Sequence, residues 1–317
     1  MNQLNAIGID VGGSSIKCGV VNIKGDILYS NTVIIKNATT QGAVVGLMAE
    51  AINDCAKRFE HSILGVGVGF PGIIENNTVI AGGINLPGFK NIELGNILKL
   101  VTRRNIVIDN DANMMGLGEM IYGADRDCTD VVFLTVGTGI GGAVMINSKI
   151  YGGFKNKGTE LGHMIVQHKG LACACGARGC LEAYASISAM VRHYKSINKG
   201  SSPDIDAKYI VGQYLQRESY AIEVMEQHFD YMASGIVSLI NLFNPQRVII
   251  GGGISEAGKF YIREIERRVS ALAVPTGVGA AQIVAASLGN KAGIMGCAAN
   301  VFQKYYSADF TSHRLPV

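Results

Sequence analysis

The chain has 317 residues, of which 48% are hydrophobic and 17% are charged, and its formal net charge is +3. This length predicts about two domains, and this composition is typical of a folded globular protein and excludes an intrinsically disordered one. Lysine and arginine are scattered along the chain, so neither nucleic acid nor an anionic membrane is predicted as a partner.

The first part of the chain is predicted to hold mostly strands. Short apolar runs bounded by glycine or polar residues predict strands, and apolar residues at helical spacing predict helices. In chain order these are strands at 6–9, 16–23 and 27–35, a helix at 44–59, strands at 64–70 and 105–108, and a helix from about 114 to 122.

The second part of the chain is predicted to be richer in helices. In chain order it holds strands at 131–136 and 143–146, helices at 186–194 and 220–243, a strand at 247–250, a helix at 258–272, a strand at 283–286 and a helix at 290–305. Strands and helices mixed in this way predict an α/β fold with two lobes. We place the smaller lobe at 1–117 and the larger at 118–317, with the terminal helix able to pack back near the smaller lobe.

The sequence also indicates where the protein resides. Its first residues carry no charged segment followed by an apolar run, so no signal peptide is predicted. The longest charge-free stretch, 131–148, is interrupted by glycines and predicts two strands around a turn rather than a membrane helix. Four of the seven cysteines, Cys18, Cys55, Cys128 and Cys297, are scattered in apolar surroundings. This pattern is not a disulfide framework and favours a cytoplasmic protein.

Three apolar strands are each followed directly by a glycine-rich turn. Backbone N–H groups in such turns can approach a phosphate closely, although a single turn of this kind is more often an ordinary hairpin. The three turns contain Asp10, Gly12, Gly13 and Ser14, then Gly137, Thr138 and Gly139, and finally Gly251, Gly252 and Gly253. Because Asp10 could hold a magnesium ion through water, we predict that the turns bind phosphate groups and Mg²⁺.

Asp111 is the candidate catalytic base. It follows the predicted strand at 105–108, in a loop that enters a helix. Transfer of a phosphoryl group to a hydroxyl needs a carboxylate that accepts the hydroxyl proton. The residues alone leave two alternatives open. Asp111 could merely cap the following helix, or Asp109 could be the base instead.

A candidate metal site lies in the segment 158–182. One imidazole and three thiols are the ligands that zinc prefers in a closed tetrahedral site, which is structural and does no chemistry. These ligands are His163, Cys173, Cys175 and Cys180. His168 is the alternative to His163 as the fourth ligand. The alternative to a metal site is that the three cysteines are simply reduced thiols in a glycine-rich turn. The loop would fix Glu160 and Glu182, whose carboxylates suit a ligand rich in hydroxyl groups.

Together these motifs resemble the ROK family of sugar kinases and repressors, over nearly the whole chain. The resemblance is carried by DVGGSS at 10–15, PG at 71–72, NLPG at 85–88, NDAN at 110–113, GTGIG at 137–141, ELGH at 160–163, CACGARGCLE at 173–182 and GGG at 251–253. It implies a two-lobed, actin-like ATPase fold of the ribonuclease H-like type, with the zinc loop in the larger lobe. Thr159 departs from the family pattern, which usually has glycine before the glutamate.

The resemblance also implies a role for each motif. ATP and Mg²⁺ would bind at the three glycine turns, and Zn²⁺ at the histidine and the three cysteines. Asp111 would be the general base. The sugar would be held by Gly72, Asn85, Asn110, Asp111, Glu160, His163 and Glu182. A side chain at Gly139 is then expected to impair ATP binding and to leave sugar binding nearly unchanged.

The predicted function is therefore a cytoplasmic, homodimeric, ATP-dependent hexose kinase that acts on the 6-hydroxyl of glucose. The nearest alternatives are kinases of the same family for N-acetylmannosamine, N-acetylglucosamine, fructose or a β-glucoside. A repressor of this family is not expected, because it would need a DNA-binding domain before Asp10, where nine residues stand. A non-catalytic actin-like protein is not expected either, because it would not need the zinc loop. We expect Thr159 to crowd the sugar 2-position and so to favour glucose.

Overall fold

The structure is a computed structural model that describes residues 4–35, 38, 40–59, 62–83, 86, 88–124, 126–200, 204–272, 281–307 and 310. It divides into two compact units, each built from separate stretches of chain. The first comprises Met1–Thr129, Val144–Thr159 and Asn290–Val317, and the second comprises Asp130–Ala143 and Glu160–Gly289. This grouping differs from the predicted lobes, 1–117 and 118–317, because the first unit extends to Thr129 and also takes in Val144–Thr159. The terminal stretch, which was expected to be able to pack near the smaller lobe, is also part of the first unit.

The first unit is built on a five-stranded sheet with the order β3-β2-β1-β4-β8. Strands β1 (Asn5–Val11), β2 (Ser15–Asn22) and β3 (Ile27–Ile34) are antiparallel, whereas β4 (Ile63–Phe70) and β8 (Ile106–Asn110) run parallel to β1. The strands predicted around the first glycine turn are therefore confirmed. The parallel strands place Asp10 and Gly69 in register, and likewise Gly69 and Asp109, at one end of the sheet.

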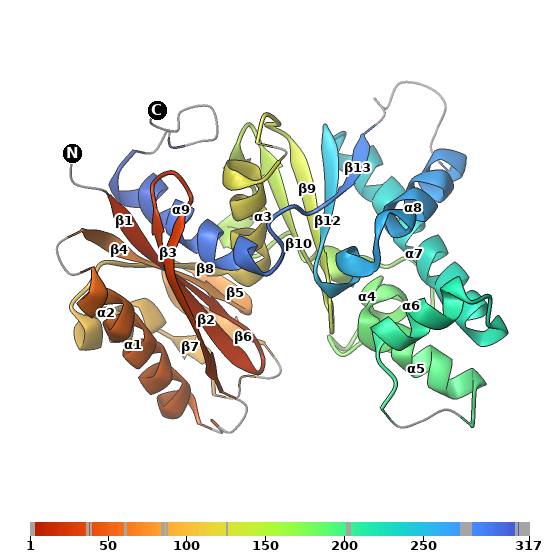
Figure 1. Cartoon of the computed structure of the whole chain (residues 1–317), viewed down its shortest axis with the longest axis horizontal. Helices are drawn as coiled ribbons and strands as arrows, with labels where there is room; N and C mark the ends of the chain where they lie inside the picture. Colours follow the sequence, from red (N-terminus) through yellow and green to blue (C-terminus); the bar gives the residue numbers. More distant parts are fainter. Residues whose placement is uncertain are drawn as a thin grey trace. The chain divides into compact units, whose positions relative to one another are not determined.

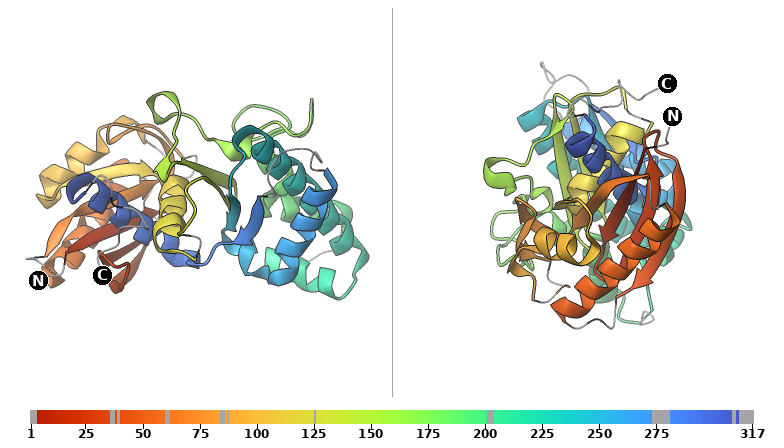
Figure 2. Two further views of the ribbon diagram at one scale, coloured as in Figure 1. Left: turned by 90° about the horizontal axis from the view of Figure 1, so that it is seen from above. Right: turned by 90° about the vertical axis from the view of Figure 1, so that its left-hand side faces the viewer.

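Helices cover both faces of this sheet (Figures 1 and 2). Helices α1 (Gln41–Arg58) and α2 (Leu94–Thr102) share a hydrophobic core with alternate residues of β1 and β4. On the other face, α9 (Ala292–Tyr305) approaches so closely that a Cβ on Gly8 would lie 2.0 Å from the Ile294 carbonyl oxygen. Glycine is required there because no side chain fits. Helix α3 (Asp111–Tyr122) packs against α9.

Several short elements of the first unit were not predicted from the sequence. They are a three-stranded sheet of β5 (Gly72–Glu75), β6 (Thr78–Gly82) and β7 (Lys90–Ile92), the two-residue strand β11 (Lys149–Ile150), and helix α2. A 3₁₀ turn, η1 (Phe154–Asn156), lies in the loop that follows β11 and contacts β5.

The second unit has a parallel core of β9 (Val131–Val136), β12 (Arg247–Gly251) and β13 (Gln282–Ala285). Strand β10 (Ile140–Ile146) begins earlier than predicted, so Gly141 and Gly142 lie in a strand and not in the turn. It leaves this unit at Ala143 and pairs with β11 in the first.

The remaining helices belong to the second unit. They are α4 (Glu182–Ala185), α5 (Ile187–Ile197), α6 (Ala207–Leu215), α7 (Ser219–Phe243) and α8 (Lys259–Leu272), with 3₁₀ turns η2 (Leu161–His163) and η3 (Gly253–Ala257). A further 3₁₀ turn, η4 (Gly289–Lys291), begins at the last residue of this unit and leads into α9. Helix α6 was not predicted. Within the described ranges, every helix is too short or too polar to cross a membrane.

His228 makes the stability of the second unit sensitive to acid. It is buried between α7 and α8, where its Nε2 lies 2.8 Å from the Tyr261 hydroxyl, and burial lowers its pKa from 6.5 to about 4. A lowered pKa in the folded state means that only the unfolded state takes up a proton between these values. Stability from this group is therefore full above pH 6.5 and is lost as the pH falls towards 4.

We expect this loss to reach roughly 3 kcal/mol, since each unit of pKa difference corresponds to about 1.4 kcal/mol. Urea unfolding of the wild type and of His228→Gln, measured at about pH 7 and about pH 4.5, isolates the contribution of this group. The variant should lose less stability than the wild type over this interval. Parallel losses in the two proteins would show that His228 is not the acid-sensitive group.

Candidate active site

The predicted catalytic segment lies where β8 ends and α3 begins. Asn110 caps α3, because its Oδ1 accepts hydrogen bonds from the N–H groups of Ala112 (2.9 Å) and Asn113 (3.2 Å). Its Nδ2 donates to the Gly72 carbonyl oxygen at 3.0 Å. The helix begins at Asp111, earlier than predicted, so the alternative in which Asp111 serves as the cap is wrong. Asp111 is instead a partly exposed residue of the first helical turn.

The rival carboxylate, Asp109, is engaged in holding this segment together. Its Oδ1 accepts hydrogen bonds from the Asn110 N–H (2.7 Å), from Asn113 Nδ2 (3.0 Å) and from Asn156 Nδ2 (3.1 Å). Three donors on one oxygen tie the end of β8 to α3 and to the loop after β11. This arrangement gives Asp109 a structural role and leaves Asp111 as the better candidate for the base.

The sugar-side residues Gly72 and Asn85 differ in what the structure shows. Gly72 opens β5 at a φ of +130°, and a Cβ there would lie 2.1 Å from the Ala81 carbonyl oxygen, so only glycine fits. Its carbonyl group then receives the Asn110 amide. Asn85 lies outside the described residues.

The first glycine turn joins β1 to β2, and Asp10 stands at the end of β1. Gly13 and Ser14 are exposed, and the Gly12 N–H donates to the Ser15 carbonyl oxygen at 2.9 Å. The Asp10 carboxylate is buried, and burial raises its pKa although Lys17, at 3.8 Å, opposes the shift. A carboxylate held below the turn in this way suits a magnesium ion bound through water.

The second glycine turn, between β9 and β10, lies directly against Glu182. Oε2 of Glu182 accepts a hydrogen bond from the Ile140 N–H at 2.9 Å, and a Cβ on Gly139 would lie 2.4 Å from the same oxygen. At Gly137, by contrast, nothing stands within 4 Å of a Cβ. The turn and the carboxylate of the metal loop therefore form one structure, which the sequence did not reveal.

This contact changes the effect expected from a substitution at Gly139. A Cβ there must displace Glu182, so we expect Gly139→Ala to raise the Michaelis constants for both ATP and sugar. Gly137→Ala meets no neighbour within the protein and should raise the constant for ATP alone, because its methyl group occupies the space that a phosphate would approach. Steady-state kinetics of the two variants would contradict this assignment if Gly139→Ala left the constant for sugar unchanged.

The third glycine turn lies near a groove that sequence reasoning missed. Gly252, after β12, has a φ of +87°, and a Cβ there would lie 2.3 Å from the Val136 carbonyl oxygen. Ile187 connects the second and third turns: its N–H donates to the Gly137 carbonyl oxygen at 2.9 Å, and its Cδ1 lies 3.9 Å from a Cβ on Gly253.

The groove has a volume of about 520 Å³ and is formed by α5 and by the residues that lead into α6. Its apolar lining includes Ile187, Val191 and Ile205, and its polar lining comprises Ser188, Arg192, Lys195 and Asp206. Apolar walls with a few polar groups are typical of sites for small organic molecules. No sequence pattern indicated this groove, because α6 itself was not predicted.

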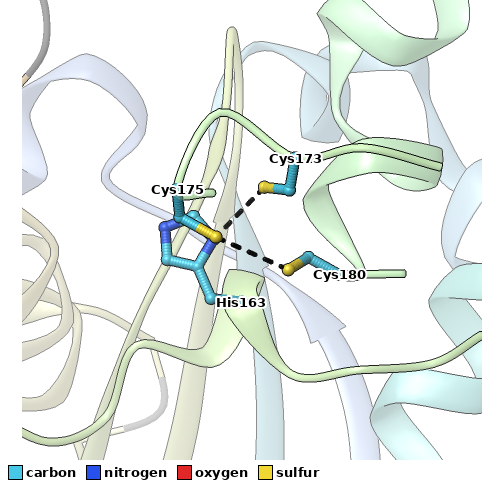
Figure 3. A group of neighbouring side chains, drawn as sticks. All are labelled: His163, Cys173, Cys175 and Cys180. Atoms are coloured by element: carbon cyan, nitrogen blue, oxygen red, sulfur yellow. Dashed lines mark hydrogen bonds between the residues drawn. The ribbon is translucent and has the colours of Figure 1, made fainter. Parts of the chain in front are cut away.

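The four predicted metal ligands converge on one point (Figure 3). One ligand atom from each of His163, Cys173, Cys175 and Cys180 lies within 4.8 Å of the others. The Cys175 and Cys180 sulfurs are 3.7 Å apart, and the Cys173 sulfur is 3.7 Å from His163 Nδ1. A tetrahedral zinc with Zn–S bonds of about 2.3 Å separates its sulfurs by about 3.8 Å, so the set fits zinc. His168, the alternative ligand, is exposed and is not part of the set.

Two glycines shape the metal loop. Gly176 and Gly179 have φ values of +93° and +86°, in the region that favours glycine, and a Cβ on Gly179 would lie 1.8 Å from the Gln167 carbonyl oxygen. The turn between them brings Cys180 back beside Cys175. Cys173 Sγ also lies 3.8 Å from Glu182 Oε1. Glu182 is thereby held between the metal ligands and the second glycine turn.

Glu160 and Thr159 precede η2. Glu160 is exposed, so its carboxylate is accessible. Thr159 has a φ of +63°, which is unusual for a β-branched residue, and its hydroxyl donates to the Gly158 carbonyl oxygen at 2.7 Å. The left-handed conformation explains why glycine would be preferred at this position and shows that Thr159 is accommodated at some cost in strain.

Comparisons with known proteins identify the family to which the chain is similar. The ROK family model matches residues 6–304 of the chain. A glucokinase from Thermotoga maritima is 35% identical over 318 residues, which cover 96% of this chain and 99% of the relative. A ROK family glucokinase from Streptomyces griseus, crystallised in complex with glucose and AMPPNP, has a TM-score of 0.79 at 30% identity and covers 93% of this chain and 98% of its own. A ROK hexokinase from Thermus thermophilus has a TM-score of 0.82 at 28% identity, with 93% and 97% covered.

Proposed function

The chain belongs to the ROK family and is an ATP-dependent sugar kinase, and we propose that it phosphorylates the 6-hydroxyl of glucose. The observation that supports phosphoryl transfer to a sugar most directly is the position of Glu182. This carboxylate, a candidate sugar ligand, accepts a hydrogen bond from the backbone that follows the second glycine turn. Phosphoryl transfer requires the acceptor to lie beside the phosphate, and catalysis is largely a matter of this positioning.

In the proposed mechanism Asp111 orients the sugar hydroxyl and accepts its proton as the oxygen attacks the γ-phosphoryl group. Asn110, Glu160, Glu182 and His163 hold the other hydroxyls. His163 faces the metal ligands through Nδ1, which leaves Nε2 for a hydrogen bond to the sugar. Zinc, when bound, neutralises the thiolates and fixes the loop.

ATP is proposed to lie across the glycine turns. The backbone N–H groups of the glycine turns would hold its phosphates, and Asp10 would hold a Mg²⁺ ion that offsets phosphate charge. The groove between α5 and α6 would receive the adenosine half, because Ile187 both lines this groove and bonds to the second turn. Asp206 Oδ1 caps α6 by accepting the Tyr209 N–H at 2.8 Å, and the other oxygen of this carboxylate would accept a hydrogen bond from the ribose. We also expect a homodimer, as the family resemblance implies.

The sugar itself is tested by a panel of acceptors. Glucose should exceed N-acetylmannosamine and N-acetylglucosamine in kcat/KM, because the Thr159 side chain crowds the sugar 2-position. Thr159→Gly removes that side chain and also relieves the strained φ. The variant should therefore reduce the difference in kcat/KM between glucose and the N-acetylated sugars without losing stability. A coupled assay of ADP release across the panel measures both effects.

The second candidate is a hexokinase of broader range or one selective for an N-acetylated sugar. The similarity to a ROK hexokinase supports the alternative in which the enzyme accepts several hexoses. If the unmodified protein phosphorylates an N-acetylated sugar best, Thr159 does not crowd the 2-position and glucose is the wrong substrate.

A further inference from the structure

The loop that follows β11 contains a side chain aimed at the catalytic segment. Asn156 Nδ2 lies 3.1 Å from Asp109 Oδ1 and 3.3 Å from the Ile74 carbonyl oxygen. Both neighbours are acceptors, so the amide nitrogen, with its two hydrogens, must face them. Asn156 has a φ of +56°, a conformation that asparagine adopts more readily than most residues. The residue type, the backbone conformation and the hydrogen bonds therefore all favour asparagine at position 156, with its amide nitrogen directed at Asp109.

The space around Asn156 is shaped to hold it. A Cβ on Gly152 would lie 1.8 Å from Asn156 Oδ1, so glycine at this position is needed for the amide to keep its place. The Gly158 N–H closes the loop by donating to the Gly152 carbonyl oxygen at 2.7 Å.

Two ion pairs anchor the same loop to β5. Glu75 lies 3.1 Å from Lys157 and 3.4 Å from Lys155, and the hydrogen bond from Lys157, followed by the effects of Lys155, lowers the pKa of Glu75. These pairs are exposed on the lysine side and so contribute little energy, but they hold the loop along the strand that starts at Gly72. The loop thus follows the strand whose first carbonyl group binds Asn110.

Asp109 links Asn156 to the segment that carries the proposed base, Asp111. Its Oδ1 also binds the Asn110 N–H and Asn113 Nδ2, and Asp111 is the next residue after Asn110. A carboxylate fixed from three sides cannot rotate, and its neighbours in the chain are fixed with it. Among the described residues, the other two donors to Asp109 Oδ1, Asn110 and Asn113, belong to its own segment, so Asn156 supplies the contact from outside it.

We propose that Asn156 is a positioning residue for phosphoryl transfer, which acts through Asp109 to hold Asn110 and Asp111 in place. The inference rests on the proposed function, in which Asp111 is the general base. Asn156 would touch neither sugar nor nucleotide. The expected consequence of its loss is slower turnover rather than weaker binding, because misplacement of a catalytic group by about 1 Å can cost about 10²-fold in rate.

Asn156→Asp is the sharpest test. It preserves the shape of the side chain and tolerance of the left-handed backbone, but it replaces the donor with a carboxylate that faces Asp109. We expect kcat to fall about 10–100-fold, a usual cost of removing a supporting hydrogen bond, with the Michaelis constant for ATP nearly unchanged.

The pH dependence separates positioning from simple loss of structure. Two carboxylates in contact share a proton more readily than one alone, and a protonated carboxyl group can donate a hydrogen bond to Asp109 again. The ratio of kcat for Asn156→Asp to that of the wild type should therefore rise as the pH is lowered from about 8 to about 5.5. A loop that has merely lost its structure would give a ratio that stays flat or falls.

A second variant and a matched control complete the test. Gly152→Ala leaves Asn156 in the sequence but pushes its amide aside, so it should also lower kcat, with no recovery at low pH. Lys155→Gln removes one of the two ion pairs to Glu75 and leaves the Asp109 contact intact, so its kcat should stay at the wild-type value. Melting temperature, metal content and binding of ATP establish that each protein is folded.

The possible failures are distinguishable. Unchanged kcat in folded Asn156→Asp and Gly152→Ala overturns the positioning role, whatever Asp111 does. If Asp111→Asn retains full activity, the base assignment in the proposed function is wrong instead. If Asn156→Asp and Lys155→Gln lose activity equally, activity depends on the structure of the whole loop, and the specific positioning role of Asn156 is wrong.

Discussion

Asp111→Asn should lower kcat by about 10²–10⁴-fold, the usual contribution of general acid–base catalysis. Asparagine keeps the size and polarity of the side chain at the first position of α3 but cannot accept the hydroxyl proton. Asn110 caps the helix, so the exchange at Asp111 leaves the cap intact and the fold should be unaffected. The Michaelis constant for the sugar should change far less than kcat, which a coupled assay of ADP release measures directly.

Asp109→Asn is the matched control. An amide oxygen at this position can still accept the three hydrogen bonds that Asp109 Oδ1 receives from Asn110, Asn113 and Asn156. We therefore expect a much smaller loss of activity than for Asp111→Asn. The reverse result, an active Asp111→Asn and an inactive Asp109→Asn, would identify Asp109 as the base.

The glycine turns were predictable because each directly follows a strand with a strong apolar signal. Strands β1, β2 and β9 are almost wholly buried, and runs of Val and Ile bounded by glycine reveal such strands. The elements that the sequence did not reveal are short. Strands β5, β6 and β7 have four, five and three residues, too few for a periodic pattern. Their pairing depends on partners elsewhere in the chain.

The start of α3 shows how a local ambiguity was resolved by the fold. Asp109, Asn110 and Asp111 are all residues that can cap a helix, so the sequence could not decide among them. The Gly72 carbonyl group, 38 residues away in sequence, fixes the Asn110 side chain, and Asn110 then becomes the cap. That contact comes from the pairing of strands and has no local signature.

The same distinction divides the candidate site. The metal ligands were predictable because three of the four lie within eight residues of one another, Cys173 to Cys180, and zinc sites have characteristic ligand types. The contacts of Glu182 with the second glycine turn and of Asn156 with Asp109 join residues 42 and 47 positions apart. Only the folded chain brings such pairs together, which is why neither contact was predicted.

Cys175→Ser should release the metal and abolish sugar phosphorylation. Purified wild-type protein is expected to contain about one zinc ion per chain, since four protein ligands make a closed structural site. Binding free energy at such a site is folding energy for the loop around it. Without the metal, the loop loses the constraint that holds Glu182 against the Ile140 N–H, and the sugar loses that carboxylate.

Nucleotide binding separates this local effect from general unfolding. The first and third glycine turns contain none of the metal ligands, so Cys175→Ser should still bind ATP, measured by calorimetry or by a fluorescent analogue. Cys128→Ser is the matched control, because Cys128 is also a free cysteine but lies outside the metal set; this variant should keep both zinc and activity. Elemental analysis of the wild type and of Cys175→Ser measures the zinc content and so tests whether the variant has lost the metal. Full activity in wild-type protein that a strong chelator has stripped of metal would contradict the role of zinc in supporting the sugar site.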